Sequence, residues 1–216
     1  MDDNTDFGFY GILTNPRVGY ETLASIMVEQ QVRYIQLRIK DRSREDILNM
    51  ARRIRSIVKG KSLFIVNDHP DVAKEAEADG VHLGQEDMSI EEARTILGSD
   101  AIVGISTHNP SQTQAACALK PDYIGVGPVY ATPTKKIPDP VIGLDGMRAM
   151  VQMARVPAVA IGGIDLKNLD DVLQNGARNV CAVRCINNAE DPEFVLKKVI
   201  KQIRDKRSTH ETPLDT

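Results

Sequence analysis

Two hydroxyl groups and two ammonium groups follow an apolar segment near the middle of the chain. Residues 124–129 are apolar and contain two glycines, a composition that favours a strand buried on both faces. Shortly after it come Thr132, Pro133, Thr134, Lys135 and Lys136. Hydroxyl and ammonium donors that converge in one loop can bind phosphate. An isolated segment of this kind is usually an ordinary polar turn, so its interpretation depends on the rest of the chain.

A second polar set alternates with apolar residues in segment 35–40. The period of two places Gln36, Arg38 and Lys40 on one face of a strand. In a half-exposed antiparallel strand these side chains would simply face water. In a parallel barrel strand they would line the interior or the mouth, where two unpaired cations are costly. The pattern in a barrel therefore predicts a bound anion.

Carboxylates follow two successive apolar segments, residues 63–66 and 81–83. Asp68 comes after the first segment and Asp87 after the second. Carboxylates at the same edge of a parallel sheet, completed by water and phosphate oxygens, suit Mg²⁺. The two residues could equally be N-caps of the following helices, and the sequence leaves both interpretations open.

Further polar or small residues stand at the ends of later apolar segments. Ser106 and His108 end the fifth segment, and Gly162-Gly163 ends the seventh, where a side chain would obstruct a phosphate near backbone N–H groups. We expect Arg184 in the eighth strand. The loops after the last two strands of an α/β barrel are a recurrent phosphate site.

The histidines show no pattern of their own. We expect His82, inside an apolar segment, to be a core histidine with its hydrogen bonds satisfied, and His69 and His210 to lie at the surface. The sequence contains no Ser–His–Asp arrangement and no His-rich zinc spacing.

These residues need a scaffold, and the alternation of the chain predicts one. Eight apolar segments alternate with eight helical patterns, the count of a (β/α)8 TIM barrel; a doubly wound open sheet is the alternative. N-cap residues are expected at Ser43, Ser89, Asn109, Asp165 and Asp191. The expected strands are 9–13, 35–39, 63–66, 81–83, 102–105, 124–129, 158–161 and 180–186. The expected helices are 21–31, 44–58, 70–78, 90–97, 111–119, 144–154, 166–174 and 193–204.

Composition narrows the class of protein. The 216 residues carry a formal charge of −3, which gives no basic footprint for nucleic acid. Residues 1–6 are acidic and polar, so we expect no signal peptide and no membrane span. Three cysteines without C-x-x-C spacing predict reduced thiols in a cytoplasmic protein, with Cys181 and Cys185 in a strand. We expect one domain over residues 1–216, ordered from about 7 to 206, with short polar tails.

Taken in order, the motifs resemble those of thiamine-phosphate synthases, from about residue 9 to 206. They are Gln36-x-Arg38-x-Lys40, Asn67-Asp68, Gly84-Gln85-Glu86-Asp87, Gly104-x-Ser106-x-His108, Gly125-x-Gly127-Pro128 with Thr132-x-Thr134-Lys135, and Gly162-Gly163-Ile164. The resemblance implies a transferase on a TIM barrel. With Mg²⁺, this family joins 4-amino-5-hydroxymethyl-2-methylpyrimidine diphosphate to hydroxyethylthiazole phosphate and releases diphosphate. It also implies two small-molecule substrates and a homodimer.

The resemblance also implies roles for individual residues. The pyrimidine diphosphate would be contacted by Gln36, Arg38, Lys40, Asn67, Ser106 and Lys135. Among these, Arg38, Lys40, Ser106 and Lys135 would be catalytic. Asp68 and Asp87 would bind Mg²⁺. The thiazole phosphate would be held by Thr132, Thr134, Gly163, Val183 and Arg184. The family is thought to react dissociatively, so that diphosphate leaves before the thiazole nitrogen captures the pyrimidine cation.

Two departures and three rival interpretations remain. Many members of the family carry serine where Arg184 stands, and an arginine there could add a bidentate phosphate contact. Pro133 supplies no N–H to the threonine loop. A thiazole tautomerase would share the fold but would not need the Asp68/Asp87 pair for a diphosphate. A non-catalytic sensor of phosphate ligands would not need the metal and cation set. A phosphosugar isomerase would explain Gly162-Gly163 but not the polar set of segment 35–40.

Overall fold

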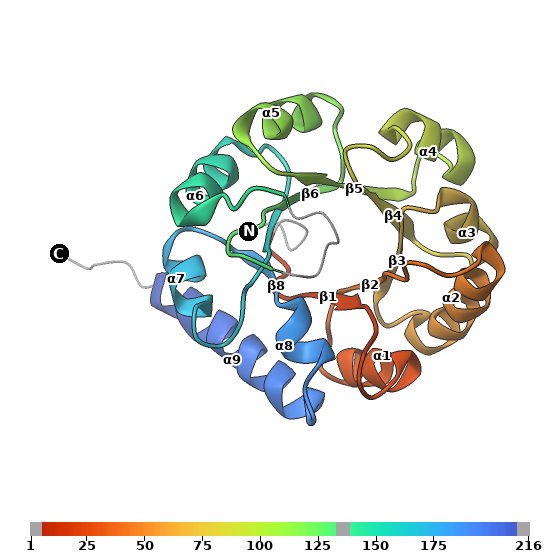
Figure 1. Cartoon of the computed structure of the whole chain (residues 1–216), viewed down its shortest axis with the longest axis horizontal. Coiled ribbons are helices and arrows are strands. Elements are labelled where there is room, and N and C mark those ends of the chain that lie inside the picture. The colour runs from red at the N-terminus through yellow and green to blue at the C-terminus, as the bar shows by residue number, and fades with distance from the viewer. Residues whose placement is uncertain (1–5, 133–138, 211–216) are drawn as a thin grey trace.

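Eight parallel strands form a barrel, and helices cover its outer face (Figure 1). The computed structural model describes residues 6–132 and 139–210. Strands pair with their neighbours in sequence order. The first and last units also meet, because Phe9 bridges Val180 in parallel and the Val180 N–H donates to Gly8 O at 2.8 Å. The predicted (β/α)8 barrel is therefore confirmed, and the open doubly wound sheet is excluded.

The elements alternate as predicted, with one additional short helix near the end. The strands are β1 (Tyr10–Leu13), β2 (Tyr34–Leu37), β3 (Leu63–Asn67), β4 (Gly80–Leu83), β5 (Ile102–Thr107), β6 (Tyr123–Val126), β7 (Ala158–Ile161) and β8 (Asn179–Cys181). The helices are α1 (Tyr20–Glu29), α2 (Arg44–Val58), α3 (Pro70–Glu75), α4 (Ile90–Leu97), α5 (Pro110–Ala118), α6 (Gly143–Met153), α7 (Leu169–Gln174), α8 (Val183–Asn187) and α9 (Pro192–His210).

Side chains cap the starts of four helices, α2, α4, α5 and α9. Ser43, Ser89 and Asn109 each accept a hydrogen bond from the backbone N–H three residues later, which confirms them as N-caps. Asp191 does the same for the N–H of Phe194 at 2.9 Å. The prediction for Asp165 was wrong, because α7 begins at Leu169. Asp165 instead holds the turn before the helix, where its side chain accepts the Lys167 N–H.

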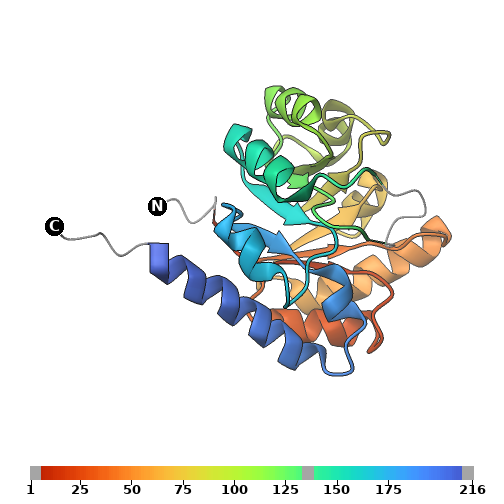
Figure 2. The ribbon, with the colours of Figure 1, turned by 60° about the vertical axis from the view of Figure 1, so that its left-hand side comes forward.

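Two asparagines join the first and last strands of the barrel at the seam between β1 and β8. Asn179 accepts the N–H groups of Phe7 and Gly8 at 2.8 and 2.9 Å. At the opposite end of the barrel, Asn187 accepts the Thr14 N–H at 2.9 Å and donates to Ile12 O at 2.8 Å. Helix α9 packs against α1, α7 and α8 and so lies outside this seam (Figures 1 and 2).

The inside of the barrel contains aromatic residues. The rings of Tyr10 and Tyr34 stack with centroids 5.7 Å apart, and the Tyr123 centroid lies 5.3 Å from that of Tyr10. Gly104 on β5 makes room for Tyr123, since a Cβ on Gly104 would lie 2.1 Å from the ring carbon Cζ. The aromatic layer fills the barrel below the polar strand ends.

The end of the chain differs from the prediction. The eighth strand stops at Cys181, so Arg184 and Cys185 lie in α8 and not in a strand. Helix α9 continues to His210, so the chain after about residue 206 is helical there and not yet a tail. The rest of the expected tails, residues 1–5 and 211–216, lies outside the described residues. In the part of the chain that the structure describes, every helix is too short or too polar to cross a bilayer.

Candidate active site

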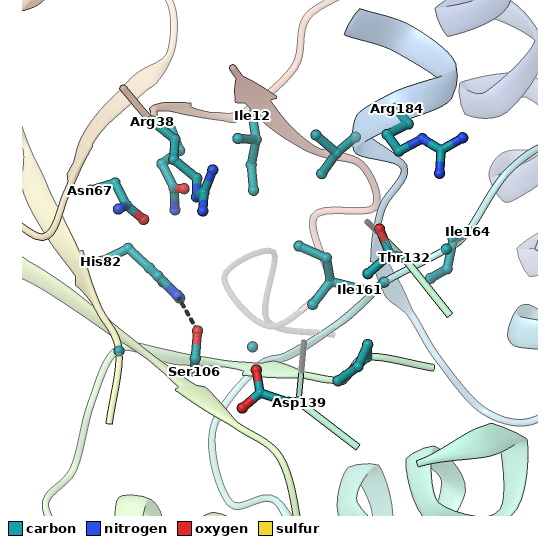
Figure 3. Close-up of a pocket in the computed structure, with 18 of the residues that line it drawn as sticks. Ile12, Arg38, Asn67, His82, Ser106, Thr132, Asp139, Ile161, Ile164 and Arg184 are labelled. Carbon is teal, nitrogen blue, oxygen red and sulfur yellow. Dashed lines mark hydrogen bonds between the residues drawn. The ribbon is translucent and has the colours of Figure 1, made fainter. Parts of the chain in front are cut away.

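A cavity of about 570 Å³ opens at the carboxyl ends of the strands (Figure 3). Every strand end contributes to its lining, from Ile12 of β1 to Val183 just after β8. The lining includes the predicted site residues Gln36, Arg38, Lys40, Asn67, Asp68, Asp87, Ser106, Thr132, Gly163, Val183 and Arg184. Thr134 and Lys135 lie outside the described residues. Residues predicted from separate motifs thus meet in one cavity.

One side of the cavity carries a buried cation. Arg38 follows β2 and reaches the cavity beside Asn67 (Figure 3). Burial lowers the pKa of its guanidinium from the usual value, and Asp68 opposes this shift. No ion pair to Arg38 is found among residues 6–132 and 139–210. Lys40 differs, because its ammonium group forms an ion pair with Asp68. A partly buried arginine that forms no ion pair within the described part of the chain favours an anionic ligand.

The two predicted carboxylates lie next to each other. Asp68 adopts a left-handed backbone conformation with φ of 64°, and its N–H donates to His82 O at 2.8 Å. Asp87 accepts the Gly84 N–H at 2.7 Å. Burial raises the pKa of the Asp87 carboxyl, and its hydrogen bond and repulsion with Asp68 act in the same direction. The pair concentrates negative charge at the cavity rim.

Neither carboxylate caps a helix. The residue at the start of α3 is His69, which makes no side-chain cap, and α4 is capped by Ser89. The N-cap alternative for Asp68 and Asp87 is therefore wrong. No group of three or more His, Cys, Asp or Glu that could hold a metal ion occurs in the described part of the chain. Asp68 and Asp87 thus offer two oxygen ligands and leave further positions for water or substrate oxygens.

The opposite side of the cavity contains Thr132 and Arg184 (Figure 3). Arg184 is exposed on the first turn of α8, where it lies at the rim of the cavity. It had been predicted inside the eighth strand. That prediction was wrong, because Arg184 lies in α8, exposed at the mouth of the cavity, where a guanidinium can approach a ligand from solvent.

The packing of two loops gives a further reason for the double glycine at the cavity. A Cβ on Gly162 would lie 2.5 Å from Pro128 Cα, and one on Gly163 would lie 2.6 Å from Tyr130 Cβ. Both residues have positive φ, +102° and +65°. The glycines therefore allow the β7 loop to pack against the β6 loop, and the predicted role beside a phosphate stays a prediction.

We expect Gly162→Ala to destabilise the protein by about 2–4 kcal/mol, from the left-handed backbone and the overpacked methyl group together. Gly98→Ala is a matched control, because Gly98 has φ of +101° and nothing within 4 Å of the added Cβ. Denaturant unfolding of both variants separates the two costs. Equal destabilisation would show that the contact with Pro128 carries no energy.

Sequence reasoning missed the place of His82 in the site. It is a hydrogen-bonded core histidine, as predicted, with Nδ1 at 3.0 Å from Tyr123 Oη. Its Nε2, however, lies 2.9 Å from Ser106 Oγ, and both side chains line the cavity (Figure 3). The alternation of Val81, His82 and Leu83 in β4 could have placed this histidine on the interior face.

His108 and Asp139 form a second missed contact. The His108 Nδ1–H donates to Gly127 O at 2.6 Å, and its Nε2 lies 3.5 Å from an Asp139 carboxylate oxygen. Both residues line the cavity. The contact joins the end of β5 to residue 139, on the carboxyl side of the segment 133–138 that lies outside the described residues.

Comparison with known proteins matches this barrel to one enzyme family. A family model described as thiamine monophosphate synthase matches residues 13–186. A thiamine-phosphate synthase of Methanosarcina barkeri is 39% identical over 180 residues, covering 83% of this chain and 82% of that protein. One from Caldicellulosiruptor saccharolyticus is 39% identical over 204 residues, 92% of each chain. Another, from Gloeobacter violaceus, is 46% identical over 159 residues, 73% of this chain, which spans only 46% of that longer protein.

Solved structures extend the comparison. A thiamine phosphate pyrophosphorylase from Pyrococcus furiosus superposes with a TM-score of 0.85 at 31% identity, covering 94% of this chain and 98% of the other. A 3-hexulose-6-phosphate synthase superposes with a TM-score of 0.64 at 17% identity over 91% of this chain and 99% of the other. The latter likeness concerns the fold alone.

Proposed function

Because this chain belongs to the thiamine monophosphate synthase family, we propose that it transfers an aminopyrimidinylmethyl group from its diphosphate to a thiazole phosphate. The products are thiamine phosphate and diphosphate. The observation that carries the proposal is the meeting of the described motif residues in one cavity. A chance set of polar turns would have been scattered over several loops and both ends of the barrel.

Arg38 and Lys40 are assigned to the diphosphate. Arg38 is partly buried with no ion pair among the described residues, and Lys40 stands beside the carboxylates with Asp68 as partner. Lys135, outside the described residues, is assigned the same role. These cations neutralise charge that grows on the leaving diphosphate as the C–O bond breaks, a form of electrostatic stabilisation.

The carboxylate pair fits Mg²⁺. Burial and, to a lesser extent, the neighbouring Asp68 raise the pKa of Asp87, and a hard divalent cation would offset both effects. Mg²⁺ usually keeps several waters and takes one or two protein carboxylates together with substrate phosphate oxygens. When bound, Mg²⁺ supplies positive charge beside the leaving diphosphate. Asp68 and Asp87 would hold the ion, and Lys40 would remain close enough to share Asp68.

The reaction we propose is dissociative. The C–O bond breaks first, its electron pair leaves with the diphosphate, and the thiazole nitrogen then donates its lone pair to the pyrimidine methylene cation. Gln36, Asn67 and Ser106 hold the pyrimidine ring, while Arg38 and Lys40 hold the diphosphate. The bond-forming step needs no general base, which agrees with a site built from cations, amides and hydroxyls.

The thiazole phosphate is assigned to the opposite side of the cavity. Thr132, Gly163, Val183 and Arg184 line that side, and Thr134, outside the described residues, is assigned to the same group. The exposed guanidinium of Arg184 can make a bidentate contact with a phosphate. The two phosphorylated substrates would then approach from separate sides with their reacting atoms between them.

Incubation of the protein with both substrates and Mg²⁺ tests the proposal directly. Thiamine phosphate would be detected by its fluorescence after oxidation. Isomerisation of the thiazole without condensation would indicate a tautomerase. Ligand binding without any turnover would indicate a sensor. A homodimer and a cytoplasmic location stay predictions, which sedimentation and cell fractionation can test.

We expect Arg184→Ala to raise the KM for thiazole phosphate by about 10-fold or more, the value of one charge-assisted contact, with a smaller change for pyrimidine diphosphate. Arg204→Ala is the control, because Arg204 is exposed on α9 and does not line the cavity. Steady-state kinetics with each substrate varied in turn gives both constants. Equal increases for the two substrates would show that Arg184 does not belong to the thiazole side.

A further inference from the structure

Five side chains form a continuous chain of hydrogen bonds across the barrel below the cavity. Gln36 Nε2 donates to Tyr10 Oη at 3.1 Å, and Tyr10 Oη lies 2.6 Å from Tyr123 Oη. Tyr123 Oη lies 3.0 Å from His82 Nδ1, and His82 Nε2 lies 2.9 Å from Ser106 Oγ. Figure 3 shows the last of these bonds. We call these five residues the barrel-floor chain.

The part of the barrel-floor chain from Gln36 to Tyr123 is buried. Tyr10, Tyr123 and Gln36 are 2%, 1% and 2% exposed. Burial raises the pKa of both tyrosines, so each phenol keeps its proton and must donate it to a neighbour. Because burial separates these groups from bulk water, the donor and acceptor at each contact depend on those at the next.

The hydrogen bonds of the barrel-floor chain all run in one donor-to-acceptor direction, which follows from the first bond. Tyr10 accepts from the Gln36 amide and donates its own proton to Tyr123. Tyr123 then donates to His82 Nδ1, so the proton of the neutral imidazole must sit on Nε2. That Nε2–H donates to Ser106 Oγ. The hydroxyl proton of Ser106 is left to point into the cavity.

The opposite direction leaves a proton without a partner. If Ser106 donated to His82, His82 would donate to Tyr123 and Tyr123 to Tyr10. Tyr10 would then accept from both Tyr123 and Gln36, and its own proton would find no acceptor among residues 6–132 and 139–210. Such a buried, unsatisfied donor is unfavourable. The observed amide orientation of Gln36 therefore selects one direction for all five residues.

The two ends of the barrel-floor chain present opposite hydrogen-bonding groups to the cavity, a donor and an acceptor. Ser106 offers a donor. Gln36 has used its amide N–H toward Tyr10, and its carbonyl oxygen, which has no donor among the described residues, offers an acceptor. A ligand edge that matches both ends must carry an acceptor for Ser106 and a donor for Gln36. A ring nitrogen with a neighbouring exocyclic amine has that pattern.

We propose that the barrel-floor chain, acting through His82, fixes Ser106 as donor and Gln36 as acceptor and so selects an aminopyrimidine over its oxo analogue. This inference rests on the proposed function. In the oxo analogue an oxygen replaces the exocyclic amine and the ring nitrogen carries a proton, so donor and acceptor are exchanged. His82, Tyr123 and Tyr10 are positioning residues, because they act through the two end groups.

The tautomer of His82 is the first test and needs no substrate. The protein contains only four histidines, so their ring nitrogens can be distinguished by ¹⁵N NMR after histidine labelling, with assignment by single substitution. We expect His82 to carry its proton on Nε2. His108 is an internal reference with the opposite tautomer, because its Nδ1 must be protonated to donate to Gly127 O. A proton on His82 Nδ1 with an unprotonated Nε2 would overturn the proposal.

The second test interrupts the barrel-floor chain by removing one oxygen atom. Tyr123→Phe removes the hydroxyl between Tyr10 and His82. Tyr34→Phe is the matched control, since Tyr34 belongs to the same aromatic cluster and its hydroxyl makes no hydrogen bond within the described residues. Calorimetry without thiazole phosphate would measure the affinities for the amino and the oxo diphosphate. We expect the ratio of the two to fall about 10-fold or more in Tyr123→Phe and to stay unchanged in Tyr34→Phe.

The outcomes separate this inference from the proposed function. A parental protein that prefers the amino diphosphate but makes no thiamine phosphate would refute the function and support the barrel-floor chain. Normal synthesis with the same affinity ratio in Tyr123→Phe and Tyr34→Phe would refute the proposed role of the barrel-floor chain and leave the proposed function standing. If Tyr123→Phe does not fold, Tyr10→Phe breaks the same chain one bond earlier and must give the same loss of preference, while the KM for thiazole phosphate stays at its parental value.

Discussion

Replacing Asp87 with asparagine is expected to lower kcat by about 100-fold or more, the usual effect of removing one preorganised electrostatic group. Asparagine can still accept the Gly84 N–H, so the loop should keep its shape. It cannot supply the negative charge that, with Asp68, fits a divalent cation. The variant should also unfold at an equal or higher temperature without metal, because the desolvation of the Asp87 charge and its repulsion with Asp68 are both gone.

Glu86→Gln is the control for this substitution. Glu86 precedes Asp87 in the same loop, is exposed and does not line the cavity. Paramagnetic resonance of added Mn²⁺ measures metal binding separately from turnover. We expect the parental protein and Glu86→Gln to bind Mn²⁺, and EDTA to abolish their activity until Mg²⁺ is added. Full activity in EDTA, or unchanged Mn²⁺ binding in Asp87→Asn, would remove Asp87 from the metal site.

Arg38→Met should lower kcat by about 100-fold while making the protein more resistant to heat. The guanidinium is partly buried, and no ion pair offsets its desolvation within the described residues. Methionine fills much of the same volume without the charge, so the unliganded protein gains stability. The catalytic loss falls on kcat because the proposed contact strengthens as the diphosphate leaves.

Arg42→Met provides the comparison for Arg38, since Arg42 is exposed and lies outside the cavity lining. It should change neither kcat nor the melting temperature appreciably. Steady-state kinetics and thermal unfolding of both variants give the required values. If Arg38→Met changed only the KM for the pyrimidine diphosphate, Arg38 would be a docking residue, and the dissociative role proposed for it would be wrong.

Local sequence patterns were sufficient to predict most of the strands and helices of the fold. The strands are short and apolar, and Ser43, Ser89 and Asn109 mark helix starts through bonds within one helical turn. Such contacts depend only on neighbouring residues, so the sequence shows them. The strand-end rule of parallel barrels then placed Asp68 and Asp87 at one rim although no motif joins them.

The wrong predictions concern segments whose structure depends on contacts between residues far apart in the sequence. Segment 180–186 is an apolar run that suits a strand or a buried helix equally. Its second half becomes helical as it leads to Asn187, whose side chain bonds to Thr14 and Ile12, 173 and 175 positions away. The close approach of Gly162 to Pro128 likewise belongs to two loops that only the folded barrel brings together.

His82 shows a third kind of limit. The sequence predicted correctly that its hydrogen bonds are satisfied, but it could not name the partners. Tyr123 and Ser106 come from β6 and β5, and their distances to the imidazole depend on the register in which β4, β5 and β6 pair. A residue that is structural by its burial can therefore belong to the site by its partners.

The seam at Asn179 and Asn187 has a consequence for folding kinetics. Its side-chain hydrogen bonds join residues 171 to 175 positions apart, whereas neighbouring strands pair in sequence order. Contacts of such long sequence separation form late, because the loop entropy must be overcome first. The diphosphate side of the cavity can assemble from β2, β3 and β4 alone, while Ile12 and Val183 meet only across the closed seam. Recovery of circular dichroism should therefore precede recovery of activity when the unfolded chain refolds.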